Sequence, residues 1–207
     1  LQNSDVEMLP KLLTAIQPSQ IKKIAIGSHS VGILTAIGQA VERGGLTGLQ
    51  EIDFHYVDLD EDDEIELGDL GTLGNFGPAF HRLNLSNSQI ENISGLEICK
   101  NLRTLNLSCT EVTDVSVLGS CSSLYDLDLS TTQVADVSAL GSCSTLHTLA
   151  LNETQVADVS ALGSCNNLHT LYLSSTQVTD VSTLGSCNKL RDIDLSNTQV
   201  ADVSALG

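Results

Sequence analysis

The chain has 207 residues and a formal net charge of −17, from 26 Asp and Glu against nine Lys and Arg. Nucleic acid is not an expected partner, because phosphate binding needs a clustered basic surface, and an anionic membrane surface is disfavoured for the same reason. Hydrophobic residues make up 41% of the chain and aromatic residues only 3%, so the core is predicted to be aliphatic. No stretch approaches the ~20 apolar residues of a membrane-spanning helix, so membrane insertion is not expected.

Residues 1–79 are predicted to alternate helices and strands. A helix is expected over residues 5–16, with Asp5 as its candidate N-terminal cap. Two segments, which begin at Ile21 and at Leu49, carry apolar residues at their positions 1, 4 and 6, with a 28-residue spacing between their starts. The two-residue step from position 4 to position 6 is typical of a strand with one buried face. Between them, residues 31–45 have helical apolar spacing and end on two glycines, which predicts a second helix.

The densest charge in the chain is the acidic run at residues 58–69, DLDEDDEIELGD. Alternating acids followed by a glycine are loosely similar to a calcium-binding loop, but the full spacing and the closing glutamate of that motif are missing. The run is therefore interpreted as a solvated insertion between repeats. A docking site for a basic partner is the alternative.

From Phe80 onward the sequence has a 22-residue period, with five full units and a sixth that stops at Gly207. Within each unit, positions 1, 4 and 6 follow the pattern of a half-buried strand, and the apolar positions 11, 14 and 17 suit a short 3₁₀-like turn. No unit can bury these side chains alone, so the units must stack, each strand pairing in parallel with the next. Because the chain starts at Leu1 and stops inside a unit, it is interpreted as a piece of a longer protein.

The phrase L-x-x-L-x-L in residues 80–207 resembles the leucine-rich-repeat family. The 22-residue unit with its Asp-Val-Ser-x-Leu phrase is similar to internalin-type and phosphatase-regulator-type repeats. The fuller phrase TQVADVSALGSC is similar in wording to leucine-rich-repeat proteins of trypanosomatid protists. The 28-residue spacing near the N-terminus resembles ribonuclease-inhibitor-type repeats.

This resemblance implies an α/β fold, a leucine-rich-repeat solenoid with a parallel β-sheet on the concave face. N-terminal helices, and then 3₁₀ or turn segments, are expected on the convex face. Two regions are expected: helix-bearing units with the acidic insertion at residues 1–79, and the regular array at residues 80–207. A separate N-terminal domain is the alternative to one continuous solenoid.

Three columns of the array are predicted to be structural. Position 9, where the family has Asn, is Thr from the second unit onward, and its hydroxyl can still bond the turn backbone. Position 13 is Asp in every unit but the first, which has Asn92, and it is predicted to cap backbone amides rather than bind calcium. Position 20 holds Cys99, Cys121, Cys143, Cys165 and Cys187. These are predicted to be buried free thiols rather than metal ligands or disulfides.

Positions 2, 3 and 5 of the strands vary from unit to unit, unlike the structural columns. This variation indicates either that no structural constraint acts on these side chains or that they recognise a partner. Tyr, His and Arg among them are residue types that anchor interfaces, and the Asp residues suit a basic partner. The residues predicted to bind a partner are Tyr125, Asp126, Asp128, His147, His169, Tyr172, Arg191, Asp192 and Asp194. No metal site is predicted at the neighbouring His147 and His169, because no third ligand is evident.

No Ser-His-Asp constellation, phosphate loop or convergent carboxylate pair is found, so neither a catalytic residue nor a cofactor is expected. The sequence predicts a non-enzymatic module that binds a protein partner through its concave face. The acidic charge allows a basic partner, but such charge most often serves solubility alone. An architectural segment of a large assembly and the targeting arm of an enzyme with its catalytic domain elsewhere stay open. Five reduced thiols favour an intracellular, cytoplasmic setting over the cell surface or secretion. No oligomeric state is predicted.

Overall fold

The computed structural model describes residues 20–27, 37, 46, 48–55 and 80–207. These residues form one eight-stranded sheet, in which each strand pairs in parallel with the strand that follows it in the sequence. The strands are β1 (Lys23–Gly27), β2 (Glu51–His55), β3 (Arg82–Asn84), β4 (Thr104–Asn106), β5 (Asp126–Asp128), β6 (Thr148–Ala150), β7 (Thr170–Tyr172) and β8 (Asp192–Asp194).

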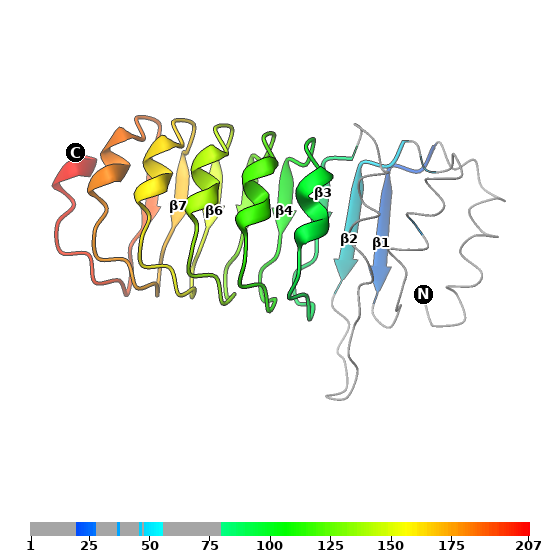
Figure 1. Cartoon of the computed structure of the whole chain (residues 1–207), viewed down its shortest axis with the longest axis horizontal. Helices are drawn as coiled ribbons and strands as arrows, with labels where there is room; N and C mark the ends of the chain where they lie inside the picture. Colours follow the sequence, from blue (N-terminus) through cyan, green and yellow to red (C-terminus); the bar gives the residue numbers. More distant parts are fainter. Residues whose placement is uncertain (1–19, 28–36, 38–45, 47, 56–79) are drawn as a thin grey trace.

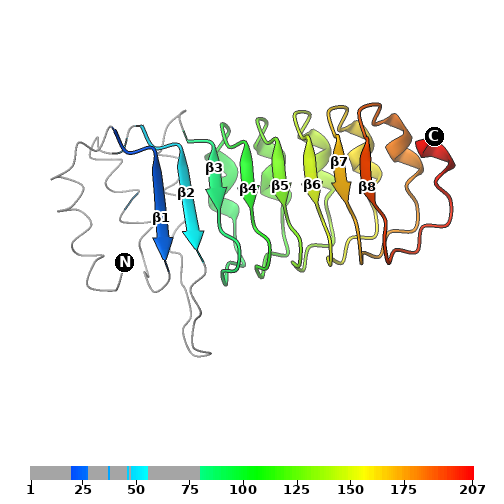
Figure 2. The ribbon, with the colours of Figure 1, turned by 180° about the vertical axis from the view of Figure 1, so that it is seen from behind.

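A short 3₁₀ helix follows each strand of the 22-residue array. These helices are η3 (Ser94–Ile98), η4 (Ser116–Ser120), η5 (Ser138–Ser142), η6 (Ser160–Ser164), η7 (Ser182–Ser186) and η8 (Ser204–Leu206). Figures 1 and 2 show the array from its two sides, with the row of 3₁₀ helices in front in one view and the sheet in front in the other. The predicted solenoid, with its parallel sheet and its 3₁₀ segments, is confirmed.

The two strands of the N-terminal region extend the same sheet. Ile24 of β1 pairs with Ile52 of β2, which in turn pairs with Leu83 of β3. The side chains of Leu49 and Ile52 are fully buried, and Ile24 packs partly buried against the same core. The strands predicted from the 28-residue spacing are therefore confirmed, with their position-4 residues in register with those of the array.

Other expectations for the N-terminal region fall on residues that the structure leaves undescribed. The helices predicted over residues 5–16 and 31–45 lie outside the described residues, apart from Ile37, whose side chain is fully buried in the core. The acidic run at residues 58–69 also lies outside them.

The core of the array is a continuous aliphatic ladder. In the fourth unit, Leu146, Leu149 and Leu151 at positions 1, 4 and 6 are fully buried, and so are Val156 and Leu162 at positions 11 and 17. Each packs beside the equivalent residue of the neighbouring units, because the strand register brings every position onto its own counterpart. Phe80 is buried at position 1 of the first unit, and the later units have Leu there, in agreement with the low aromatic content.

Local hydrogen bonds end each strand at a fixed residue. The hydroxyl of Thr154, at position 9, donates to the carbonyl oxygen of Leu151 at 2.7 Å, and the equivalent threonines repeat this bond. Threonine therefore supports the turn as predicted. The preceding residue, at position 8, has a positive φ in every unit although none is glycine: Asn87, Cys109, Thr131, Glu153, Ser175 and Asn197. The identical turns place positions 2 to 5 in the same way on every rung.

Candidate partner-binding face

The side chains at positions 3 and 5 of the strands line the outer surface of the sheet, here called the strand face. Position 4 between them is buried in every strand of the array except β8, the last. Parallel pairing aligns Asp126 of β5 with Thr148, Thr170 and Asp192 across the sheet. The adjacent row runs from Asp128 through Ala150 and Tyr172 to Asp194. The sheet thus brings together the four predicted aspartates and Tyr172 on one surface.

The aspartates of the strand face differ in how they are engaged. Oδ1 of Asp128 accepts from the backbone N–H of Ser130 at 2.9 Å. Oδ1 of Asp194 accepts from the backbone N–H of Ser196 at 2.9 Å and from its hydroxyl at 2.5 Å, and these hydrogen bonds, the hydroxyl's first, lower the pKa of Asp194. The structure gives the carboxylates of Asp126 and Asp192 no hydrogen bond or ion pair with other described residues. Asp128 and Asp194 thus combine a local capping role with one free carboxylate oxygen, which sequence reasoning missed.

Position 2, immediately before each strand, carries a stack of rings. The rings of Tyr125 and His147 are stacked with their centroids 4.6 Å apart and their planes 15° apart. His147 and His169 continue the stack, with centroids 4.4 Å apart and planes 10° apart. Parallel rings direct their nitrogen lone pairs within separate planes, so one zinc ion cannot lie about 2.0–2.1 Å from a nitrogen of each ring. The stacked histidines do not form a shared metal site in this arrangement.

The ring stack stays accessible from outside. Tyr125 is 43% exposed, and both histidines are half-buried. Nδ1 of His147 lies 3.3 Å from the hydroxyl oxygen of Thr148, whereas Nδ1 of His169 is buried without a hydrogen-bond partner. Arg191 follows His169 on the next rung and is exposed. The stack thus presents ring edges and a phenol to an approaching molecule.

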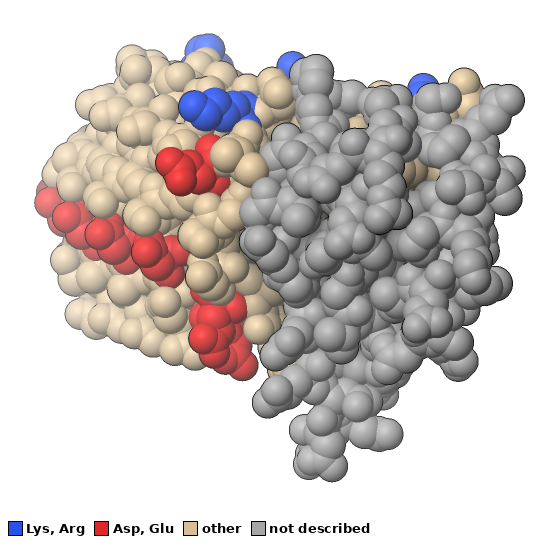
Figure 3. Space-filling view, turned by 45° about the vertical axis from the view of Figure 1, so that its right-hand side comes forward, with Lys and Arg blue, Asp and Glu red and all other residues tan. Residues whose placement is uncertain are grey.

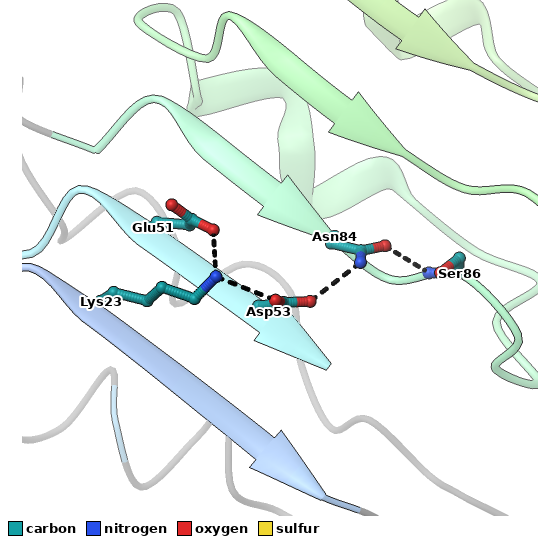
Figure 4. Close-up of polar contacts among 5 residues, drawn as sticks. All are labelled: Lys23, Glu51, Asp53, Asn84 and Ser86. Carbon is teal, nitrogen blue, oxygen red and sulfur yellow. Dashed lines mark hydrogen bonds and ion pairs between the residues drawn. The ribbon is translucent and has the colours of Figure 1, made fainter. Parts of the chain in front are cut away.

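A polar network on strands β1–β3 was not predicted from the sequence. Lys23 Nζ lies 2.6 Å from Glu51 Oε1 and 3.0 Å from Asp53 Oδ2, and both contacts raise the pKa of Lys23 (Figure 4). Asn84 Nδ2 donates to Asp53 Oδ1 at 2.9 Å, and Asn84 Oδ1 accepts from the N–H of Ser86 at 3.1 Å. Aligning the two N-terminal strand segments with the first unit of the array places these residues on neighbouring rungs. That alignment is the signal that could have found the network.

The Asp column at position 13 caps the 3₁₀ helices, as predicted. Oδ1 of Asp158 accepts from the backbone N–H of Ser160 at 2.8 Å, and Asp114, Asp136, Asp180 and Asp202 make the same bond at 2.8 Å. Asn92 does so in the first unit, also at 2.8 Å. These bonds, with the backbone N–H first, lower the pKa of each aspartate. Among the described residues, no group of three or more His, Cys, Asp or Glu is placed to hold a metal ion.

The cysteines of position 20 are buried free thiols, as predicted, and Cys109 is exposed. Sγ of Cys143 lies 3.3 Å from the carbonyl oxygen of Leu118, and Cys121, Cys165 and Cys187 contact the preceding unit in the same way. Burial raises the pKa of the Cys143 thiol to about 11. A thiol that stays protonated is a poor nucleophile and a poor metal ligand, so the column acts as small hydrophobic packing.

Within the described part of the chain, no helix is long and apolar enough to cross a membrane.

Comparison with known proteins agrees with the geometry. A family model described as Leucine Rich repeats (2 copies) matches residues 81–120, 100–142, 144–185 and 166–207. No curated protein sequence matches the chain. The internalin InlF of Listeria monocytogenes has a similar structure, with a TM-score of 0.73 and 20% sequence identity, over 91% of this chain and 52% of its own. This chain therefore spans about half the length of that internalin.

Two further structures share the fold. Internalin C2 of Listeria monocytogenes has a TM-score of 0.72 and 26% identity, over 86% of this chain and 79% of its own. The plant peptide hormone receptor RGFR1 in complex with RGF2 has a TM-score of 0.64 and 18% identity, over 87% of this chain and 29% of its own. Because the family model covers more than half of the chain, including every 22-residue unit, this chain belongs to the leucine-rich-repeat family.

Proposed function

We propose that the chain is a non-enzymatic module that binds a protein partner on the strand face of β5–β8. The observation that carries the proposal is the contrast between constant and varied residues within units of one length. Thr148 and Thr170 share a row with the free carboxylates of Asp126 and Asp192. In contrast, the positions of the hydrophobic core stay apolar in every unit, and the capping position is Asp in every unit but the first, which has Asn92.

A partner with basic side chains fits this face best. The carboxylates at the two ends of the position-3 row, on β5 and β8, are open to cations from outside. Three rung-to-rung steps of ~4.8 Å separate them by about 14 Å. Tyr172 lies between the two ends and supplies an aromatic contact of the kind that anchors interfaces. Leucine-rich-repeat proteins are commonly interaction modules, and the plant receptor with this fold is in complex with RGF2.

The test is partner capture from cell extract by the full-length protein and by a strand-face variant, Asp126→Asn, Tyr172→Ala and Asp192→Asn. We expect the variant to lose most of the capture, because two ion pairs and an aromatic contact are removed at once. Circular dichroism and the thermal midpoint should stay close to those of the parent protein, since none of the three side chains lies in the core.

A matched control carries the same charge change on the opposite side: Asp136→Asn, Asp180→Asn and Thr183→Ala. Asparagine can keep both caps, as Asn92 does in the first unit. This control should capture as much partner as the parent. Equal capture by the strand-face variant, or loss only in the control, would contradict the proposal and favour an architectural role for the 3₁₀ side.

We also propose an intracellular, reducing location for the protein. The support is the set of buried thiols, which pack as reduced cysteines in successive units. Thiol titration of freshly isolated native protein should find Cys109 reactive, and all six cysteines reactive after denaturation without reductant. If all six are blocked after denaturation, the protein comes from an oxidising compartment instead.

A further inference from the structure

Position 2 holds a cation or a ring in all six units of the array, and the five units after the one with His81 form a row. Its residues are Arg103, Tyr125, His147, His169 and Arg191, here called the rim row. Adjacent backbones of the row are hydrogen-bonded from rung to rung, as Tyr125 N donates to Arg103 O and His147 N to Tyr125 O, both at 2.8 Å. Four rung steps of ~4.8 Å separate the two arginines, so the row is about 19 Å long.

The two arginines that end the rim row are not neutralised. Both side chains are exposed, and neither has an ion pair or hydrogen bond with the described residues. The three rings between them form one continuous stack, with centroid separations of 4.6 and 4.4 Å. A flat ring platform with a free guanidinium at each end is complementary to a segment with an acid at each end and a planar group between them.

The described cations are confined to one edge of the sheet, although Glu51, Asp126 and Asp192, at position 3, lie at that edge too. All described Lys and Arg lie between position 21 of one unit and position 3 of the next: Lys22, Lys23, Arg82, Lys100, Arg103, Lys189 and Arg191. The capping aspartates lie at position 13, before the 3₁₀ helices. Figure 3 shows this separation, with Lys and Arg at the upper edge of the view and a row of acids lower down. The cations thus share the edge at which the strands begin.

We propose that the rim row binds an extended acidic segment of a protein partner. One carboxylate pairs with Arg103, a second pairs with Arg191, and an aromatic side chain between them packs on the ring stack. An extended chain rises ~3.3 Å per residue, so the two acids are about six residues apart. An even separation keeps both acids on one side of the segment, together with residues two and four positions after the first acid.

The inference rests on the proposed function and adds the chemistry of the partner at the rim. The net charge of −17 repels an acidic segment at long range. At physiological ionic strength, however, the Debye length is about 8 Å, so a bound segment responds mainly to nearby charges. The nearby acids, Asp126 and Asp192, follow Tyr125 and Arg191 in the sequence. They favour basic groups in the part of the partner that lies over the strand face. A partner with acids at the rim and bases over the face would be held in a single orientation.

The probe is a capped nonapeptide with glutamates at its second and eighth positions, tyrosine at its fourth, and glycine or serine elsewhere. The full chain is titrated with it to a few millimolar, and binding is followed by the imidazole C–H resonances of His147 and His169. We expect saturable shifts of both histidines. A peptide with glutamine in place of both glutamates, and one with lysine in place of both, should bind at least tenfold more weakly.

The double variant Arg103→Gln and Arg191→Gln should weaken binding of the acidic peptide about tenfold, because two charge-assisted contacts are lost. Lys100→Gln with Lys189→Gln is the matched control, since it removes two cations from the same edge but none from the rim row. It should change the affinity less than twofold. Equal losses in both variants, tighter binding of the lysine peptide, or no saturable shift would overturn the inference.

The strand-face and rim-row variants together separate the two proposals. The rim-row double variant leaves Asp126, Tyr172 and Asp192 in place, and the strand-face variant leaves both arginines in place. If only the strand-face variant loses partner capture and the peptide does not bind, the proposed function is supported and the acidic-segment proposal is contradicted. If the peptide binds but the strand-face variant captures the partner as well as the parent does, the acidic-segment proposal is supported and the proposed function is contradicted.

Discussion

The 3₁₀ side and the strand side of the array are built from the same units but differ in what they repeat. On the 3₁₀ side, position 20 is Cys in each full unit and position 13 is Asp in every unit but the first. Each makes one contact with its own unit or the preceding one, as Asp158 does with Ser160 and Cys143 with Leu118. On the strand side, positions 2, 3 and 5 change from rung to rung above an unchanged core. The residues that hold neighbouring units together thus lie on the 3₁₀ side and in the core. The residues that are free to vary, and so to bind a partner, lie on the strand side.

The largest predicted effect sharpens this contrast within one strand. Leu149→Ala should lower the free energy of unfolding by about 2–5 kcal/mol, because its fully buried side chain leaves a cavity between two units. Thr148→Ala, its neighbour on the strand face, should change it by less than about 0.5 kcal/mol. Urea unfolding of both variants checks the prediction. Similar losses would mean that the strand face also carries the stack.

The next effect concerns the close approach of the 3₁₀ helices. A Cβ atom on Gly141 would lie 2.9 Å from the carbonyl oxygen of Ala161, closer than side chains tolerate. Gly141→Ala should therefore cost about 1–3 kcal/mol of stability through overpacking. Gly207→Ala is the control, because its Cβ would meet only Ser204 O, at 3.9 Å. If both variants unfold at the same denaturant concentration, the helices are not held at this distance.

A pH effect should appear on the 3₁₀ side. Hydrogen bonds from Ser160, its backbone N–H first, lower the pKa of Asp158 below the usual 3.8, and the other caps behave alike. The folded state therefore binds protons less readily than the unfolded state. The stabilisation that the ionised Asp158 contributes is complete above the pKa that it has in the unfolded chain. It is lost as the pH falls through the lower pKa that Asp158 has in the folded chain. The thermal midpoint should accordingly fall as the pH drops below about 4.

Variants of the cap test the origin of that pH effect. Asp158→Ala removes the acceptor and should lower the thermal midpoint at pH 7. Asp158→Asn keeps an acceptor, as Asn92 does in the first unit, and should retain more of the midpoint while making it less sensitive to acid. If the thermal midpoint falls equally with acid in the parent and in Asp158→Asn, the pH effect comes from other carboxylates.

The smallest effect is a gain in stability at the turn between the two sides. Thr131 has a φ of 57°, which is strained for a β-branched residue, while Asn87 and Asn197 hold the same position with a φ of 55°. Thr131→Asn should raise the free energy of unfolding by about 0.5–1 kcal/mol. Calorimetry of the variant checks this prediction. A loss of stability would show that the weak 3.4 Å contact from Thr131 to Glu153 matters more than the strain.

The regular array could be predicted in detail because its contacts are local or repeat at a fixed register. Position 13 caps an amide of its own unit, which a single unit already shows. Position 4 is buried in every strand of the array before the last, because neighbouring units repeat the same residue at the same register. The stacking of Tyr125, His147 and His169 could not be predicted in the same way, because side-chain rotamers across three rungs decide whether rings stack or separate. The contacts of Asp53 depend on how two segments with a different spacing align with the first unit.

The central claim, that recognition lies on the strand side, can be tested most directly by covalent side-chain footprinting of the full-length protein with and without its captured partner. Tyr125, His147, His169 and Tyr172 should become protected when the partner binds, while the capping aspartates keep their labelling. Protection confined to residues of the 3₁₀ side, with these four side chains unchanged, would contradict the account.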